Sequence, residues 1–233
     1  MLLRRLAGWL FVGAVFAGLC GLGLWQLQRA AEKRAIEAER AAAGRAAPVA
    51  LPLDRTDYRA LRFRPVTVAG RYDAARQLLL DNQVRDGRVG YSVLTPLVLA
   101  DGRAVLVDRG WVAQGLTRAL LPDLTVAQPV DAVRGRVYVP FAGGLRLGAV
   151  SDGAGWPRVV QYLDFAALGA LVGRPLLPLV LRLDPAEPNG YRRDWPAAGL
   201  SHQRHLAYAA QWFGLALAWL ALSFYYKRVH KRP

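Results

Sequence analysis

Two long uncharged stretches dominate the hydrophobic pattern, one near each end of the chain. The first covers 23 residues from Leu6 to Gln28, and the second covers 22 residues from His205 to Tyr226. About 20 consecutive apolar residues are enough for a helix to cross the hydrocarbon core of a bilayer. The pattern therefore predicts a membrane protein with transmembrane helices over 6–28 and 205–226.

A cleaved signal peptide is the alternative for the first stretch, because Arg4 and Arg5 form a basic region in front of it. The stretch is, however, longer than the roughly 7–15 apolar residues of a signal peptide, and it ends in Trp25-Gln26-Leu27-Gln28 rather than in small residues. A lipoprotein signal at Cys20 would need a small residue where Leu19 stands. We therefore expect a retained helix.

Between the two stretches, a helix-favouring segment over 29–43 should end at Gly44, Pro48 and Pro52. After it, the pattern changes to short apolar runs rich in β-branched residues, separated by turn dipeptides such as Asp86-Gly87 and Asp101-Gly102. These runs predict strands over 64–70, 77–84, 91–99, 104–112, 132–139 and 176–183, and a short helix over 164–172. So few strands indicate one domain, an antiparallel β-sheet or small barrel with a short helix.

The basic residues outside this central region set the expected orientation. They are six in number, are accompanied by no acid, and consist of Arg4, Arg5, Lys227, Arg228, Lys231 and Arg232. Short basic tails stay in the cytoplasm, whereas long loops cross the membrane largely regardless of their charge. We therefore expect a protein of the bacterial inner membrane, with both termini cytoplasmic and the main domain periplasmic.

The fold class expected is thus a membrane α+β protein, in which two transmembrane helices flank the periplasmic β domain. The expected boundaries are 6–28 for the first transmembrane helix, 29–56 for a juxtamembrane helix and linker, 57–190 for the β-rich domain, 191–204 for a linker, 205–226 for the second transmembrane helix and 227–233 for a basic tail. Small residues in both spans allow close helix pairing or docking to another membrane protein. They are Ala14 and Gly18 in the first span and Ala210, Gly214 and Ala218 in the second.

Several classes of function lack their sequence signals. The chain has one cysteine and one methionine, which excludes a disulfide framework within the chain and copper delivery through sulfur. It has no phosphate-binding glycine loop, nucleophile elbow or His-Glu-x-x-His motif. The excess of basic residues is scattered and accompanies no nucleic-acid motif. We therefore expect neither an enzyme nor a nucleic-acid partner.

Five blocks in the chain resemble the surfeit locus protein 1 family, the cytochrome c oxidase assembly factors. In order, they are Gly23, Trp25, Gln26, Arg29 and Lys33 at the end of the first span; Phe63-Arg64-Pro65-Val66 with Gly70-Arg71-Tyr72-Asp73; Gly90-Tyr91 with Thr95-Pro96-Leu97; Val107-Asp108-Arg109-Gly110-Trp111-Val112; and His205, Leu206, Tyr208, Trp212, Phe213 and Gly214. The resemblance implies a non-enzymatic assembly factor for a haem–copper oxidase, which binds haem a transiently and assists its insertion. The implied partners are cytochrome c oxidase subunit I, haem a synthase and the lipid bilayer. A membrane-anchored scaffold that stabilises the oxidase core without haem is the alternative, and a periplasmic sensing domain is a third.

The resemblance implies that His205 is the axial ligand of the haem iron, because the family has a histidine here. Imidazole is a common haem ligand, and this residue opens the second span. Helical spacing places Tyr208 and Trp212 on the same stripe. Trp25 could face the porphyrin, and Arg29 could pair with a propionate. For His205 the alternative is an interfacial histidine that merely faces headgroups or pairs with Gln26 or Trp25. For Trp25 and Tyr208 it is a place in the aromatic belt, and for Arg29 it is snorkelling toward phosphates. A second set has other expected roles: His202 as a fallback ligand, His230 as a solvated tail residue, and Gln26, Arg109, Gly110 and Trp111 as structural or partner-contact residues.

Overall fold

The computed structural model describes residues 2–115, 121–140, 148–151, 155–195 and 200–229. The chain divides into two compact units, a helical unit made of residues 1–39 and 196–233 and a β domain made of residues 40–195. The expectation for His230 and the last two basic residues of the tail falls outside the described residues.

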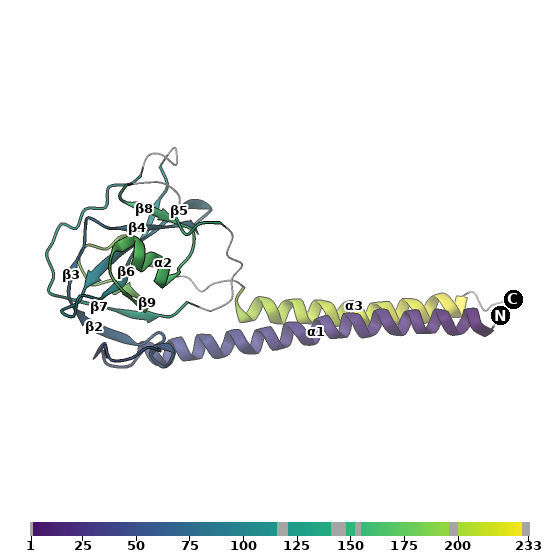
Figure 1. Cartoon of the computed structure of the whole chain (residues 1–233). Coiled ribbons are helices and arrows are strands. Elements are labelled where there is room, and N and C mark those ends of the chain that lie inside the picture. Colours follow the sequence, from purple (N-terminus) through teal and green to yellow (C-terminus); the bar gives the residue numbers. More distant parts are fainter. Residues whose placement is uncertain (1, 116–120, 141–147, 152–154, 196–199, 230–233) are drawn as a thin grey trace. The chain divides into compact units, whose positions relative to one another are not determined.

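Two helices form the helical unit, and they lie side by side in Figure 1. They are α1 (Leu2–Gly44) and α3 (His202–Val229). Both are long and apolar enough to cross a membrane. The helix-favouring segment after the first uncharged stretch continues α1 without a break, and the helix ends at Gly44, as the sequence pattern indicated.

The buried and half-buried positions of the two helices recur at alternating steps of three and four residues. In α1 they include Val12, Phe16, Leu19, Gly23, Gln26 and Ala30, and in α3 they include His205, Ala209, Trp212, Ala216 and Trp219. This heptad-like spacing keeps one stripe of each helix against its neighbour. A hydrogen bond of 3.1 Å from Trp219 Nε1 to the Val12 carbonyl joins the stripes, and it fixes the antiparallel register together with the Trp9–Phe224 ring contact.

The helices pack closely at Gly23 of α1, which has no side chain. A Cβ atom added at Gly23 would lie 2.7 Å from the ring of Phe213, so a larger residue there would force that ring to move. The small-residue rows expected to pair the spans lie elsewhere. A Cβ atom added at Gly18 or Gly214 would meet no atom within 4 Å, and Ala14, Ala210 and Ala218 are exposed. The expectation that these small residues pair the two helices is wrong, because the helices pack through the heptad-like stripes, which lie on other faces.

The β domain contains one sheet with the strand order β1-β2-β7-β9-β6-β5-β4-β8, and β3 pairs with β5. The strands are β1 (Val49–Ala50), β2 (Pro65–Ala69), β3 (Arg71–Tyr72), β4 (Leu78–Arg85), β5 (Arg88–Val98), β6 (Ala104–Ala113), β7 (Ala132–Tyr138), β8 (Arg158–Val160) and β9 (Leu176–Leu183). A 3-10 turn, η1 (Arg59–Leu61), precedes β2, and the short helix α2 (Phe165–Val172) precedes β9.

The fold class is confirmed, with one correction. The sheet is mixed and not antiparallel throughout, because β1·β2, β4·β8 and β6·β9 are parallel pairs. A parallel pair needs a long connection rather than a hairpin, and the chain between β6 and β9 supplies one that contains β7, β8 and α2. The pairings form an open path from β1 to β8 rather than a closed barrel among the described strands.

Hydrophobic side chains cover both faces of the central strands. On one face, Val105 and Val107 of β6 pack with Leu181 of β9 in the larger core cluster. On the other face, Leu106 of β6 packs with Leu168, which α2 contributes. Strands that are buried on both sides read as nearly continuous apolar runs, which explains the sequence of β6.

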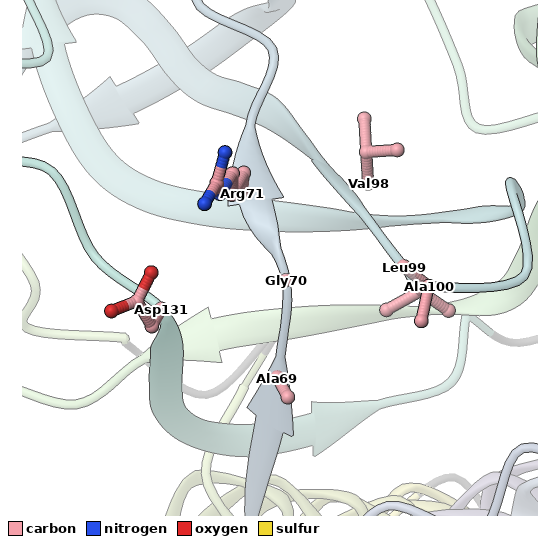
Figure 2. A pocket seen from close by; sticks show the side chains of 7 residues that line it. All are labelled: Ala69, Gly70, Arg71, Val98, Leu99, Ala100 and Asp131. Atoms are coloured by element: carbon pink, nitrogen blue, oxygen red, sulfur yellow. The ribbon is translucent and has the colours of Figure 1, made fainter.

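Gly70 allows the chain to bend between β2 and β3. A Cβ atom at this position would lie 2.6 Å from the Val98 carbonyl oxygen, so the backbone could not approach β5 with any larger residue. Figure 2 shows the small pocket of about 360 Å³ beside this bend, with the side chains of Arg71 and Asp131 at its rim. The pocket is a product of the bend.

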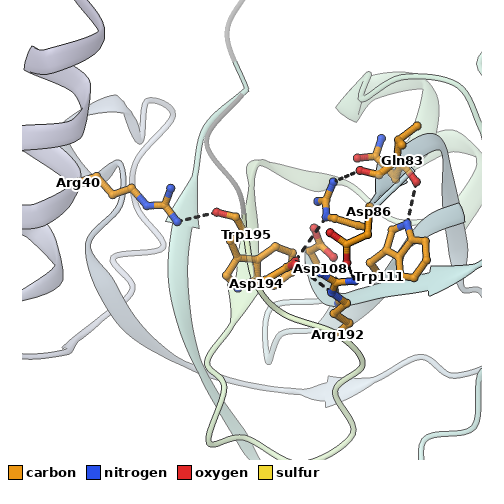
Figure 3. Close-up of polar contacts among 11 residues, drawn as sticks. Arg40, Gln83, Asp86, Asp108, Trp111, Arg192, Asp194 and Trp195 are labelled. Carbon is orange, nitrogen blue, oxygen red and sulfur yellow. Dashed lines mark hydrogen bonds and ion pairs between the residues drawn. The ribbon is translucent and has the colours of Figure 1, made fainter. Parts of the chain in front are cut away.

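The β domain includes residues on both sides of the range 57–190. At its start, Arg40 donates a hydrogen bond of 2.7 Å from Nη2 to the carbonyl of Trp195 (Figure 3). Trp195 is itself buried, and β1 pairs with β2. These contacts join the two segments expected to be linkers to the sheet.

Candidate functional site

The helix pair brings His205 against Gln26. His205 is only 8% exposed, and its Nδ1 lies 2.7 Å from Oε1 of Gln26 on the facing helix. With an amide oxygen as the acceptor, Nδ1 carries the proton and Nε2 keeps its lone pair in the neutral imidazole. This contact is one of the alternatives that the sequence left open for His205, and it occupies the Nδ1 nitrogen of the ring.

A second histidine uses the same nitrogen in the same way. His202 lies on the α1-facing side of α3, and its Nδ1 is 2.6 Å from Oε2 of Glu37. Both histidines therefore lie on the α1-facing side of α3, and each has its own partner on α1. The carboxylate makes His202 an ion-pair partner when protonated, whereas the amide beside His205 carries no charge.

The other residues expected around the haem differ in their exposure to solvent. Trp212 is half-buried on the same stripe as His205, but Tyr208 is 43% exposed and lies off the packed stripe. Trp25 is 47% exposed. Arg29 forms an exposed ion pair of 2.8 Å with Glu32, and its guanidinium lies 5.7 Å from the Trp25 ring centroid. His205 and Gln26 are thus brought together, whereas Trp212 lies two turns further along the same stripe and Tyr208, Trp25 and Arg29 are exposed.

The donor chemistry of this group fits a haem. A histidine whose Nδ1–H is held by a hydrogen bond is the usual arrangement for an axial ligand, because the bond fixes the tautomer and the ring orientation. Exposed aromatic and cationic groups of the kind that Trp25 and Arg29 supply suit a macrocycle and its carboxylates. Groups of three or more histidine, cysteine, aspartate or glutamate side chains that could hold a metal ion do not occur among the described residues.

The Val107–Val112 block occupies the interior of the β domain, and Arg109 is its most buried charged residue at 1% exposure. Its guanidinium donates to the Asn189 and Thr125 carbonyls at 2.6 and 2.8 Å, and to Gln77 Oε1 and Thr95 Oγ1 at 2.8 and 3.4 Å. The rings of two tyrosines, Tyr72 and Tyr191, lie 5.8 and 5.0 Å from it. Burial lowers the pKa of this arginine from its usual value. Arg109 therefore holds loops and strands together inside the domain.

Gly110 and Trp111 continue the same arrangement. Gly110 has φ 117°, and a Cβ atom there would lie 2.6 Å from the Arg192 carbonyl oxygen. The Trp111 backbone N–H donates to that carbonyl at 2.8 Å, and its side-chain Nε1 donates to the Gln83 carbonyl at 2.7 Å (Figure 3). The block thus connects β6 to the segment that leads out of the domain.

Sequence reasoning missed Asp108 as a member of this buried polar group. Its carboxyl accepts a hydrogen bond of 3.1 Å from the Gly110 N–H, and burial raises its pKa to about 7 although Arg182 acts in the opposite direction. The Arg182 guanidinium lies 3.9 Å from the Tyr138 ring centroid and 5.3 Å from that of Trp195. The signal in the sequence was an acid within an otherwise apolar strand, which is costly unless it has partners.

Comparison with known proteins agrees with these features. The model of the SURF1 family matches residues 13–217, most of the chain. The SURF1-like protein of Drosophila melanogaster is 28% identical, over 97% of this chain and 78% of that protein. Surfeit locus protein 1 of Mus musculus is 27% identical, over 85% of this chain and 68% of that protein, and its Homo sapiens counterpart is 26% identical over 85% and 70%. The resemblance of the five sequence blocks is thereby confirmed, and the chain belongs to the SURF1 family.

Proposed function

We propose that this protein assists the assembly of a haem–copper oxidase by binding haem a transiently and helping its insertion into subunit I. The SURF1 family is known generally as a family of oxidase assembly factors and is not a known enzyme family. The observation that carries the haem proposal is the contact of 2.7 Å between His205 Nδ1 and Gln26 Oε1, because an Nδ1–H donated to this oxygen would leave Nε2 as the nitrogen that could coordinate iron.

Each residue of the group has a distinct role in this proposal. Gln26 holds the His205 ring in one tautomer, and Trp212 supplies an apolar side wall. Tyr208 and Trp25 lie at the exposed border, where an aromatic ring can meet a macrocycle entering from the lipid side. Arg29 would exchange its exposed ion pair with Glu32 for a carboxylate of the haem, at little cost because exposed pairs contribute about 0–1 kcal/mol.

A membrane-anchored scaffold is the second candidate, and one observation favours it. His205 is nearly buried and already has a partner in Gln26, so the pair also serves as a polar contact that sets the register of α1 and α3. In a scaffold the same residues would shape the helix pair for the oxidase core subunit without touching haem. Haem a synthase is a further partner of the haem-binding role, since it would supply the ligand.

The experiment that separates the two functions is haem retention by variants. The full chain is expressed with a haem a synthesis pathway, purified in detergent, and its visible spectrum is recorded. His205→Ala should remove most of the haem, whereas Tyr208→Phe and Trp212→Phe should weaken binding less. Gln26→Leu should lower retention as well, because the ring loses its fixed tautomer.

His202→Ala is the matched control, because it removes a histidine from the same face of the same helix and should leave most haem bound. Equal amounts of purified protein are required for the comparison. Full retention in both histidine variants, together with lost oxidase assembly, would establish the scaffold function in place of haem binding. Retention in His205→Ala with loss in His202→Ala would move the ligand to His202.

The location proposed is the bacterial inner membrane, with the β domain in the periplasm. It rests on the six basic residues of the two tails. Fluorescent reporters that mature only in the cytoplasm should be bright at both ends of the chain, and a reporter that requires periplasmic oxidation should work when inserted at Asp123. A dark C-terminal fusion in a well-expressed protein would contradict this topology.

A further inference from the structure

We propose that a groove beside α2 binds an acidic peptide segment of a partner protein. The main depression has a volume of about 680 Å³ and lies among α2, the start of β9 and the segment before η1. Three of its lining residues are basic, namely Arg55, Arg103 and Arg174, and none is acidic. The proposal concerns the β domain alone and does not depend on haem binding by the helix pair.

The groove exists because small residues face it from α2. Ala166 and Ala170 are exposed, lie one turn apart and line the depression together with Gly169 and Gly173. Gly173 has φ 75° and ends the helix, so a larger side chain is also strained there. Short side chains on this face of α2 therefore leave the depression open, and Leu176 and Pro178 extend its apolar floor.

A second depression extends the groove along the chain. It has a volume of about 670 Å³ and shares Thr56, Phe165 and Pro178 with the first. It includes two acids, but both are already engaged by the domain. Asp164 accepts hydrogen bonds from the first turn of α2, and Asp57 accepts one of 2.9 Å from a backbone N–H of η1. The combined groove thus has an elongated outline, which suits an extended chain better than a compact ligand.

Two of the arginines could form an ion pair with a ligand. Arg103 is paired with Asp101 at 2.6 Å, whereas Arg55 and Arg174 form no ion pair within the described part of the chain. Nε of Arg174 is also buried without a hydrogen-bond acceptor there. Arg55 is exposed and Arg174 is half-buried, so the outer nitrogens of these guanidinium groups can pair with carboxylates of a ligand.

The chemistry favours an acidic and partly apolar peptide. Carboxylates complement the arginines at the rim, and aliphatic side chains suit a floor of alanine, leucine and proline. Nucleic acid would gain little from this groove, because base recognition in single strands relies on aromatic platforms and the groove offers only Phe165 and the buried Tyr58. The partner class is therefore a protein with an exposed segment that alternates acidic and aliphatic residues.

The test measures peptide binding by the full chain in a neutral detergent. The probe is a fluorescently labelled peptide of alternating glutamate and leucine, and its counterpart has lysine in place of glutamate. Anisotropy should rise saturably with the acidic probe, weaken with salt, and stay flat with the basic one. Absence of saturable binding by the acidic probe would overturn the proposal.

Paired variants then locate the binding. Ala170→Glu and Ala170→Lys add similar bulk at an exposed helix position that tolerates both residues, so both should fold. Ala170→Glu should weaken acidic-peptide binding by about tenfold, whereas Ala170→Lys should preserve it. The double variant Arg55→Gln/Arg174→Gln should also lose about tenfold, and Arg88→Gln, an exposed arginine outside the groove, should lose none.

Three outcomes contradict the proposal even if the acidic probe binds. Equal loss with Arg88→Gln would mean that the general positive charge of the protein attracts the peptide. Equal loss in both Ala170 variants would mean that shape alone matters. Groove-dependent binding to vesicles of anionic phospholipid, without groove-dependent binding of the peptide, would assign the groove to the membrane surface.

Discussion

Replacing Arg109 with methionine should destabilise the β domain by about 4 kcal/mol. The variant removes the donors of four buried or partly buried acceptors, on Gln77, Thr95, Thr125 and Asn189. An acceptor left without a partner inside a protein costs about 1–3 kcal/mol. Gln77 Oε1 still accepts from the Thr95 hydroxyl at 2.8 Å, so the carbonyls of Thr125 and Asn189 account for most of the loss. Part of this cost is offset, because burial of the charge is itself unfavourable and no longer occurs in the variant.

Hydrogen exchange of the β6 backbone amides measures this change in the full chain. Amides at the centre of the sheet exchange through unfolding of the whole domain, so a loss of about 4 kcal/mol should speed their exchange roughly 10³-fold. Arg109→Lys should resemble the methionine variant, because one ammonium cannot reach acceptors that lie on different sides of a planar guanidinium.

Arg88→Met is the control for removing an arginine, since Arg88 is exposed at the start of β5, and its exchange rates should change less than about threefold. The reasoning fails if Arg109→Met leaves the β6 amides within about tenfold of the parent protein. It also fails if Arg109→Lys restores the parent rates, because charge alone would then account for the role of this residue.

Three more predictions concern other parts of the molecule. Gly23→Val should separate α1 from α3 near Phe213 and raise the proteolysis rate of the helix pair, whereas Gly18→Val, on an open surface, should not. The folded-state pKa of Asp108 is raised to about 7 from 3.8, so its contribution to stability is present below about pH 4 and is lost as the pH rises to about 7. In the parent protein the free energy of unfolding should therefore fall by as much as roughly 4 kcal/mol between about pH 4 and pH 7.5, as measured by urea unfolding, and Asp108→Asn should not show this fall. The fragment 40–195 should fold alone with a β-rich circular dichroism spectrum and bind no stoichiometric haem, and specific haem binding by it would relocate the proposed site.

The parts of the fold that were predicted are those with a local signal. β5 and β6 are long runs of apolar and β-branched residues, and the turn between β4 and β5 has Asp86 and Gly87 at positive φ, as its dipeptide indicated. β1, β3 and β8 contain two or three residues each, too few to establish an alternating pattern. The parallel pairing of β6 and β9 was missed because the direction of a neighbouring strand depends on a long connection, not on either strand's sequence.

In the candidate site, too, only the features with a local sequence signal were predicted. His205 was singled out by its position at the start of an uncharged run, and Gln26 was among its expected partners. Helical spacing alone placed Tyr208 beside Trp212, whereas the stripe that packs against α1 excludes Tyr208. The partners of Arg109 lie 14 to 80 residues away in the sequence, so only the folded sheet could bring them together.

Arg40 and Trp195 are the first and last residues of the β domain, and the hydrogen bond between them closes the domain at its base. The chain therefore enters and leaves the domain at one place. The β domain is an insertion between the two helices, and its size does not affect the distance between Arg40 and Trp195. Domains built in this way tolerate exchange and replacement. A short flexible loop in place of residues 41–194 should leave the two helices free to pair, and the β domain of a relative should be transferable onto the same helices. The helix pair and the sheet can thus change in evolution as separate parts of one polypeptide.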